Sequence, residues 1–152
     1  MFKWLRKAGK PSGDPQPAGR VSEPGVSPED AAAIKWFRKA AEKGTSWGQF
    51  NLGIRYAHGN GVPQDYAEAI KWLQKAAAQK DAMSQYYLGE MYEKGLGVPV
   101  DQVKAYQWYG LAASQGIREA ENPRRRLQAS LTPEQIADAL AHPNPSVPEK
   151  SG

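Results

Sequence analysis

Few side chains in this 152-residue chain could carry out covalent chemistry. The sequence has two histidines, His58 and His142, and no cysteine. His58 stands at the predicted end of a helix, where an imidazole can bond the terminal carbonyls, and His142 begins a proline-rich tail. No nucleophile elbow, metal-ligand spacing or phosphate-binding glycine loop accompanies them. We therefore expect no enzyme activity, no cofactor and no metal site.

A basic run, Arg124 to Arg126, could contact phosphate groups or acidic partners. Glutamates such as Glu121 stand close to it in the sequence, which favours a solvated helical face instead. Arginines do not alternate with aromatic residues anywhere, and no zinc pattern is present. We expect no nucleic-acid binding.

The sequence contains two copies of a 36-residue repeat: Ala33-Ile34-Lys35-Trp36 recurs 36 positions later as Ala69-Ile70-Lys71-Trp72. The other pairs at this interval are Leu52-Gly53 and Leu88-Gly89, Tyr56 and Tyr92, Gly61-Val62-Pro63 and Gly97-Val98-Pro99, and Asp65 and Asp101. A period of about 20 to 50 residues marks a stacked-repeat architecture, in which each unit buries its apolar face against its neighbours. The repeat therefore favours a binding surface over a reaction site.

Each unit carries the start and stop signals of two helices. Ser27 and Pro28 suit the start of a helix, and Gly44 suits its left-handed end. A second helix is predicted over residues 46–58. The caps expected for the later helices are Asp65, Asp81 and Asp101.

Two features inside these helices predict tight packing. Gly53 and Gly89 fall in helix interiors, where glycine costs about 1 kcal/mol relative to alanine, so we expect neighbouring helices to approach closely there. Trp36, Trp72 and Trp108 recur at the same repeat position. We expect all three to be buried equivalently.

The repeat pattern ends before the chain does. After Gly116 the expected Leu-Gly pair is replaced by arginines, and Thr132-Pro133-Glu134-Gln135 opens a last helix that is expected to cover the open end of the array. The predicted organisation is a flexible basic arm and linker at 1–24, the repeat array with its C-terminal capping helix at 25–141, and a disordered proline-rich tail at 142–152.

These spacings resemble the Sel-one-like repeat family, a relative of the tetratricopeptide solenoids. The family pattern includes Leu-Gly-x-x-Tyr, Gly-x-Gly-Val and Ala-x-x-Trp, which appear here as Leu52-Gly53-Ile54-Arg55-Tyr56, Gly59-Asn60-Gly61-Val62 and Ala69-Ile70-Lys71-Trp72. One departure is Lys80, which stands where a glycine usually closes the second helix. The resemblance implies an all-α fold, an α-solenoid of helix–turn–helix repeats with a 36-residue period, wound as a tetratricopeptide-like right-handed superhelix. It also implies a protein–protein interaction module that acts as an adaptor or scaffold.

One face of the helix over residues 46–58 is the candidate partner-binding surface. At about 100° per residue, the side opposite Leu52 carries Trp47, Phe50, Ile54 and His58. Their counterparts in the next repeat include Met83, Tyr86 and Glu90. The resemblance to tetratricopeptide arrays places this side on the concave surface, where aromatic side chains could anchor an extended peptide or a partner helix. The alternative is that neighbouring helices cover much of the strip.

The net charge of +4 is concentrated at the N-terminus, because the first 24 residues carry five basic and two acidic groups. Phe2 to Lys7 could form a short basic and aromatic anchor for an anionic membrane, so a membrane-surface adaptor is the alternative function; a frayed terminus is favoured. No apolar stretch reaches the length of a membrane span, and no secretory leader is evident. We expect a cytoplasmic monomer whose partner is another protein or peptide.

Overall fold

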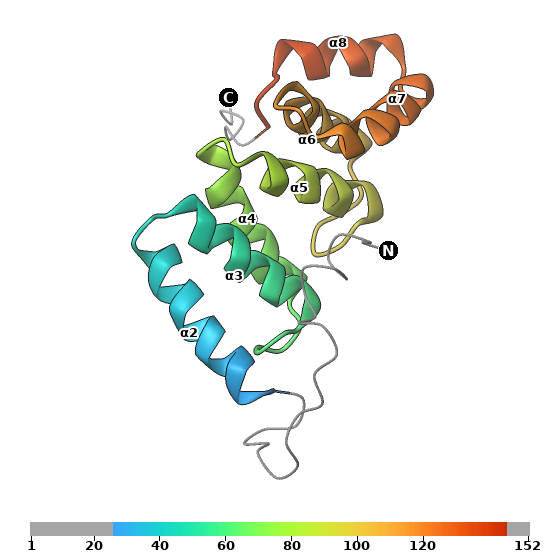
Figure 1. Cartoon of the computed structure of the whole chain (residues 1–152). Helices are drawn as coiled ribbons and strands as arrows, with labels where there is room; N and C mark the ends of the chain where they lie inside the picture. The colour runs from blue at the N-terminus through green and yellow to red at the C-terminus, as the bar shows by residue number, and fades with distance from the viewer. Residues whose placement is uncertain (1–25, 146–152) are drawn as a thin grey trace, which may run out of the picture. The chain divides into compact units, whose positions relative to one another are not determined.

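The computed structural model describes residues 26–145, and within that range the chain folds into helices joined by short turns (Figure 1). The predicted basic arm and the last seven residues of the predicted tail lie outside the described residues. The helices are α2 Pro28–Glu42, α3 Ser46–His58, α4 Tyr66–Ala78, α5 Ala82–Lys94, α6 Gln102–Ser114, the 3₁₀ helix η1 Arg118–Ala120, α7 Glu121–Ser130 and α8 Pro133–Ala141. The predicted all-α fold of helix–turn–helix repeats is confirmed.

The helix boundaries follow the 36-residue period of the sequence. Helices α3 and α5 are both 13 residues long, and each begins and ends 36 positions from the other. The same holds for α4 and α6. The repeat in the sequence is therefore a repeat of helix pairs, as predicted.

The predicted caps account for these boundaries. Asp65, Asp81 and Asp101 each accept a hydrogen bond from the backbone N–H three residues on, at 3.1, 2.8 and 3.0 Å. These bonds satisfy N–H groups that the first helical turn leaves without an intrahelical partner. Ser27 caps α2 in the same way at 3.0 Å, and Thr132 and Gln135 form the predicted capping box of α8.

The described residues form two compact units that divide between Ala76 and Ala77. In the first unit, α3 packs against α2 around a core of Ile34, Ala41 and Leu52. A methyl group built on Gly53 of α3 would lie 2.9 Å from Leu73 Cγ of α4. Glycine is therefore needed there because the two helices approach more closely than a side chain would allow.

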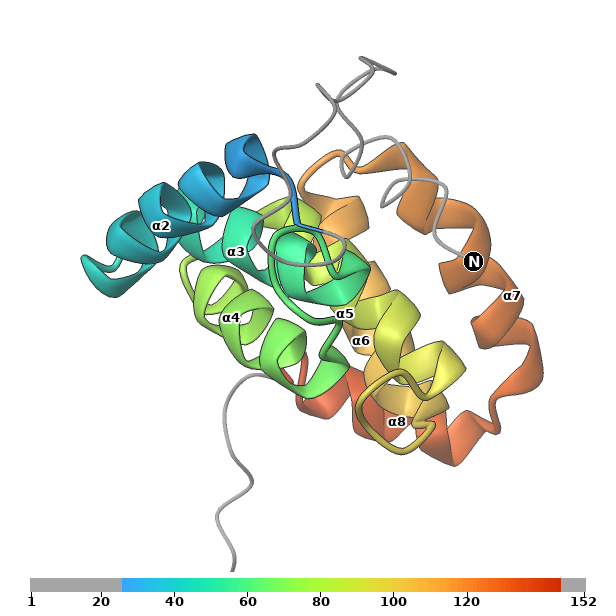
Figure 2. The same cartoon turned by 90° about the horizontal axis from the view of Figure 1, so that it is seen from below.

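In the second unit, α6 is the central helix and contacts α5, α7 and α8 (Figures 1 and 2). Its Tyr109 side chain is buried, and a methyl group built on Gly89 of α5 would lie 2.8 Å from the tyrosine ring. Both glycines that were predicted to permit close helix contact therefore do so, at the same repeat position.

The first helix of the third repeat is present although its sequence no longer matches the repeat pattern. The period predicts a helix at 118–130, and η1 together with α7 covers that range. Leu127, the counterpart of Met91, is buried. The seven-residue turns at 59–65 and 95–101 are replaced here by Leu131 and Thr132 alone, so α8 begins earlier than the period predicts.

The predicted equivalence of the three tryptophans is wrong for the first repeat. Trp108 is 1% exposed and Trp72 is half-buried, whereas Trp36 is 61% exposed. The reason is that burial in a repeat array depends on neighbours, and no helix precedes α2 within the described residues. The same residue at the same repeat position is thus part of the core in one unit and of the surface in the other.

Lys80 adopts a left-handed backbone conformation with φ of 68°, and its repeat counterparts Gly44 and Gly116 have φ of 90° and 96°. A residue with a Cβ atom is about 1–2 kcal/mol less stable in this conformation. Replacing it with glycine removes that penalty, but part of the gain is lost because glycine has more conformational freedom in the unfolded chain. We predict that Lys80→Gly stabilises the protein by about 0.5–1 kcal/mol and raises its melting temperature by about 2–4 °C.

The converse substitution, Gly116→Lys, is the matched control. No atom lies within 4 Å of a Cβ built on Gly116, so the substitution tests backbone conformation alone. It should lower the melting temperature by a similar amount. A Lys80→Gly protein that melts at or below the wild-type temperature would contradict the account.

Candidate functional site

The strip predicted on α3 contains one strongly exposed side chain. Trp47 is 48% exposed, Phe50 and His58 are half-buried, and Ile54 is 4% exposed. Ile54 is therefore part of the packing of the first unit rather than of its surface. Trp47 is therefore the residue of the strip that is most accessible to a partner.

The strip predicted on α5 is more enclosed. Tyr86 is 6% exposed, and its hydroxyl donates a 3.0 Å hydrogen bond to Glu90 Oε1. Met83 and Glu90 are half-buried. The tyrosine therefore positions the glutamate carboxylate and offers little surface of its own.

Trp47 belongs to an aromatic patch, which we define as Trp36, Phe37 and Trp47. The ring centroids of Trp36 and Trp47 are 5.0 Å apart with the rings at 72°, and those of Phe37 and Trp47 are 5.4 Å apart at 67°. Trp36 stacks on Phe37 at 5.6 Å. Each such pair contributes about 0.5–1.5 kcal/mol beyond its buried area. The three rings therefore hold one another in place although both tryptophans are exposed to solvent.

Sequence reasoning missed Trp36 as a surface residue, because it expected all three repeat tryptophans to be buried equivalently, and it did not single out Phe37. A usable signal was present. The first unit of an array has one uncovered side, so a tryptophan that is buried in a later repeat is a candidate surface residue in the first one.

Arg55 supports the patch from α3. Its guanidinium carbon lies 5.6 Å from the centre of the Phe37 ring, and its Nη1 lies 2.5 Å from Asp30 Oδ1. The ion pair is largely shielded from solvent and joins α3 to the first turn of α2. Arg55 therefore fixes the two helices that carry the aromatic patch relative to each other.

His58 stands at the other end of α3 and is not suited to a charged role. Burial lowers its pKa, and the nearby positive charge of Arg55 lowers it further. The imidazole is therefore neutral at physiological pH. Its Nε2 atom is buried without a hydrogen-bond partner, so this nitrogen does not make the predicted bond to the terminal carbonyls of α3.

A network of acids and tyrosines lies in the second unit. Tyr109 donates a 2.9 Å hydrogen bond to Glu93 Oε1, and Arg126 forms an ion pair with Glu93 Oε2. Burial, and then the charge of Glu93, raises the pKa of the Tyr109 hydroxyl. Glu93 is thus bonded on both oxygens, while Glu90 has a buried oxygen, Oε2, without a hydrogen-bond partner.

The basic run is mostly neutralised within the protein. Arg124 pairs with Glu121 at 3.1 Å, and Arg126 pairs with Glu93. Arg125 is 72% exposed and lies 3.9 Å from Glu121. The Arg124 pair lies within α7, whereas the Arg126 pair joins α7 to α5. Two of the three guanidinium groups are therefore paired inside the protein, which leaves little of the run for phosphate contacts.

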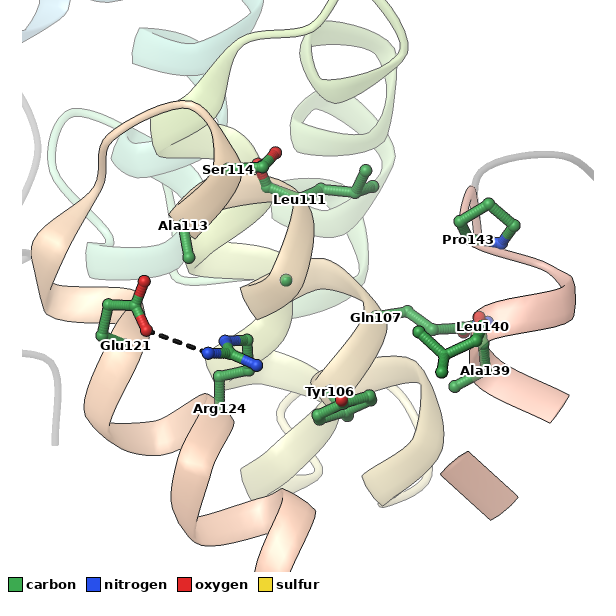
Figure 3. Close-up of a pocket in the computed structure, with 11 residues that line it drawn as sticks. Tyr106, Gln107, Leu111, Ala113, Ser114, Glu121, Arg124, Ala139, Leu140 and Pro143 are labelled. Carbon is green, nitrogen blue, oxygen red and sulfur yellow. Dashed lines mark hydrogen bonds and ion pairs between the residues drawn. The ribbon is translucent and has the colours of Figure 1, made fainter. Parts of the chain in front are cut away.

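A cleft of about 410 Å³ opens between α6, α7 and α8 (Figure 3). Tyr106 and Leu111 of α6 and Leu140 of α8 supply most of its apolar lining, and the Glu121–Arg124 ion pair lies at its edge. Gly110 lines it too, at the position that Arg38 and Gln74 occupy in the earlier repeats. Because glycine has no side chain at this position, more space is left for the cleft.

Two further properties concern residues 26–145 only. No group of three or more His, Cys, Asp or Glu side chains there is arranged to hold a metal ion. In the same range, none of the helices has the length and apolar character needed to cross a membrane.

This architecture and sequence define the class of protein. The Sel1 repeat matches residues 19–45, 48–81 and 82–117, which is more than half of the chain. The chain belongs to the Sel1 repeat family, whose members are commonly protein-interaction modules, and it has the family's α-solenoid fold.

Two solved structures are similar to this chain. One is c5321, a protective antigen present in uropathogenic Escherichia coli strains that displays an SLR fold, with 37% identity and a TM-score of 0.71. The match covers 76% of this chain and 25% of the antigen, so this chain spans a quarter of that protein's length. The other is a Sel1 repeat protein from Oxalobacter formigenes, with 42% identity, a TM-score of 0.59 and coverage of 61% and 70%. The search of curated proteins gives no match.

Glu90 provides a test of the network in the second unit. Burial raises its pKa above the ordinary value of 4.5, so the folded protein binds a proton at Glu90 more readily than the unfolded chain does. Stability from this group therefore falls as the pH rises from 4.5 through the folded pKa. We predict that Glu90→Gln stabilises the protein by about 1 kcal/mol at pH 7, because it removes a buried charge with an unbonded oxygen and keeps an acceptor for Tyr86.

Glu93→Gln is the matched control, since it removes a carboxylate that is bonded on both oxygens, and it should destabilise the protein. Thermal melts of both variants between pH 4 and pH 8 make the comparison. A Glu90→Gln protein that is less stable than wild type at pH 7 would show that the Glu90 charge is compensated in solution.

Proposed function

We propose that this chain is an adaptor that binds a protein partner through the aromatic patch on α2 and α3. The observation that carries the proposal is the exposure of Trp36 and Trp47, at 61% and 48%, on rings held in place by mutual contact. Water-exposed tryptophans contribute little to folding, yet tryptophan is among the residues most enriched at binding hot spots. Rings that are already fixed also lose little conformational freedom when a partner binds.

Phe50 extends the proposed surface along α3. It lies three residues after Trp47, so both side chains project on the same side of the helix, and it is half-buried. On α5 the proposed binding residues are Met83 and Glu90, the half-buried members of that strip. The buried Ile54 and Tyr86 belong to the packing of the first and the second unit, respectively.

Trp47→Ala tests the proposal in the full-length chain. We predict a loss of partner affinity of thirty-fold or more, which corresponds to about 2 kcal/mol. The melting temperature should fall by only about 3–5 °C, because Trp47 loses its two ring contacts while the rest of the packing stays intact. Val100→Ala is the matched control because Val100 is 57% exposed and lies in the turn at 95–101, outside both the patch and the cleft. It should leave both quantities unchanged.

The measurement is quantitative recovery of binding proteins from native lysate on immobilised wild type, Trp47→Ala and Val100→Ala, with a thermal melt of each. Partners recovered equally by wild type and Trp47→Ala would contradict the proposal. A Trp47→Ala protein that melts about 10 °C or more below wild type would instead place Trp47 among the packing residues.

A further inference from the structure

The surface around the aromatic patch is positively charged. Lys39 follows Trp36 by three residues on α2, so the two side chains are neighbours on the helix surface, and Lys43 is the C-cap residue of the same helix. Both lysines are exposed. None of the ion pairs among the described residues involves either lysine. Their charges are therefore available to a partner.

Few acidic groups offset these lysines. Helix α3 contains no aspartate or glutamate. On α2 the acidic residues are Glu29, Asp30 and Glu42, and Asp30 is paired with Arg55. Exposed tryptophan rings beside unpaired ammonium groups form a surface that is apolar at its centre and cationic at its edge.

We infer that the aromatic patch docks an acidic protein segment, in which an apolar or aromatic anchor residue is flanked by aspartates or glutamates. The anchor contacts Trp36 and Trp47, and the flanking carboxylates lie near Lys39 and Lys43. This inference rests on the proposed function and names the chemistry of its partner. Complementary charge raises the association rate and excludes partners of the wrong sign.

Charge also favours an acidic partner over the two occupants that the chain itself could supply, which are its own N-terminal residues and a second copy. The first 24 residues carry five basic and two acidic groups, so the chain's own arm has the same sign as the patch. A second copy that docks through the same face would bring like-charged lysines together. Neither is favoured over an acidic partner.

The test is selection of peptides from a displayed random library on the full-length protein, with a parallel selection on Trp47→Ala. We expect peptides that depend on Trp47 and are enriched in aspartate and glutamate around an apolar residue. The most enriched peptide is then synthesised and titrated against Lys39→Gln/Lys43→Gln. Its affinity should fall about three- to tenfold, as expected for two exposed charge contacts, and should weaken as salt is added.

Lys71→Gln/Lys80→Gln is the control, because it removes two exposed lysines that lie outside α2 and α3. It should bind the peptide within twofold of wild type. Peptides that depend on Trp47 but are neutral or basic would overturn the acidic partner and leave the proposed function standing. Enrichment of the same peptides on Trp47→Ala, or of none that depends on Trp47, would count against the proposed function itself. Sedimentation showing a dimer that Trp47→Ala abolishes would identify a second copy as the occupant and overturn the inference.

Discussion

Close approach between paired helices is the constraint on which this structure depends. At Gly53 and Gly89 a methyl group would lie within 3 Å of a side chain on the next helix, Leu73 in one unit and Tyr109 in the other. A Cβ atom at either position would push the paired helices apart. The 36-residue period is thus a period of contacts, and the caps at Asp65, Asp81 and Asp101 keep each helix in register with it.

Repeated contacts of this kind stabilise the interior of an array and leave its ends uncovered. Trp108 is enclosed within the second unit, whereas its counterpart Trp36 stands in solvent beside Trp47. The exposed aromatic surface therefore follows from the architecture, and it needs no special fold or loop. What is particular to this chain is that the exposed rings stand beside lysines that make no ion pair within residues 26–145.

The fold could be predicted from the sequence because its signals are local and repeated. Glycine at a helix interior, aspartate at a helix start and tryptophan at a fixed interval each have a physical reason to recur. The exposure of Trp36 could not be predicted in this way, because periodicity assigns the same environment to each copy and does not describe what lies beside the first one. The burial of Ile54 could not be predicted either, because it depends on packing between helices that the periodicity of one helix does not describe.

The central claim is that one repeat position is buried in the third copy and open to solvent in the first, where it forms part of the proposed binding surface. The most direct measurement is the H₂O-to-D₂O shift of the fluorine resonances in full-length protein labelled with 5-fluorotryptophan, each resonance assigned by single substitution. The account predicts a large solvent shift for Trp36 and Trp47 and almost none for Trp108. A Trp36 resonance as insensitive to solvent as that of Trp108 would contradict it.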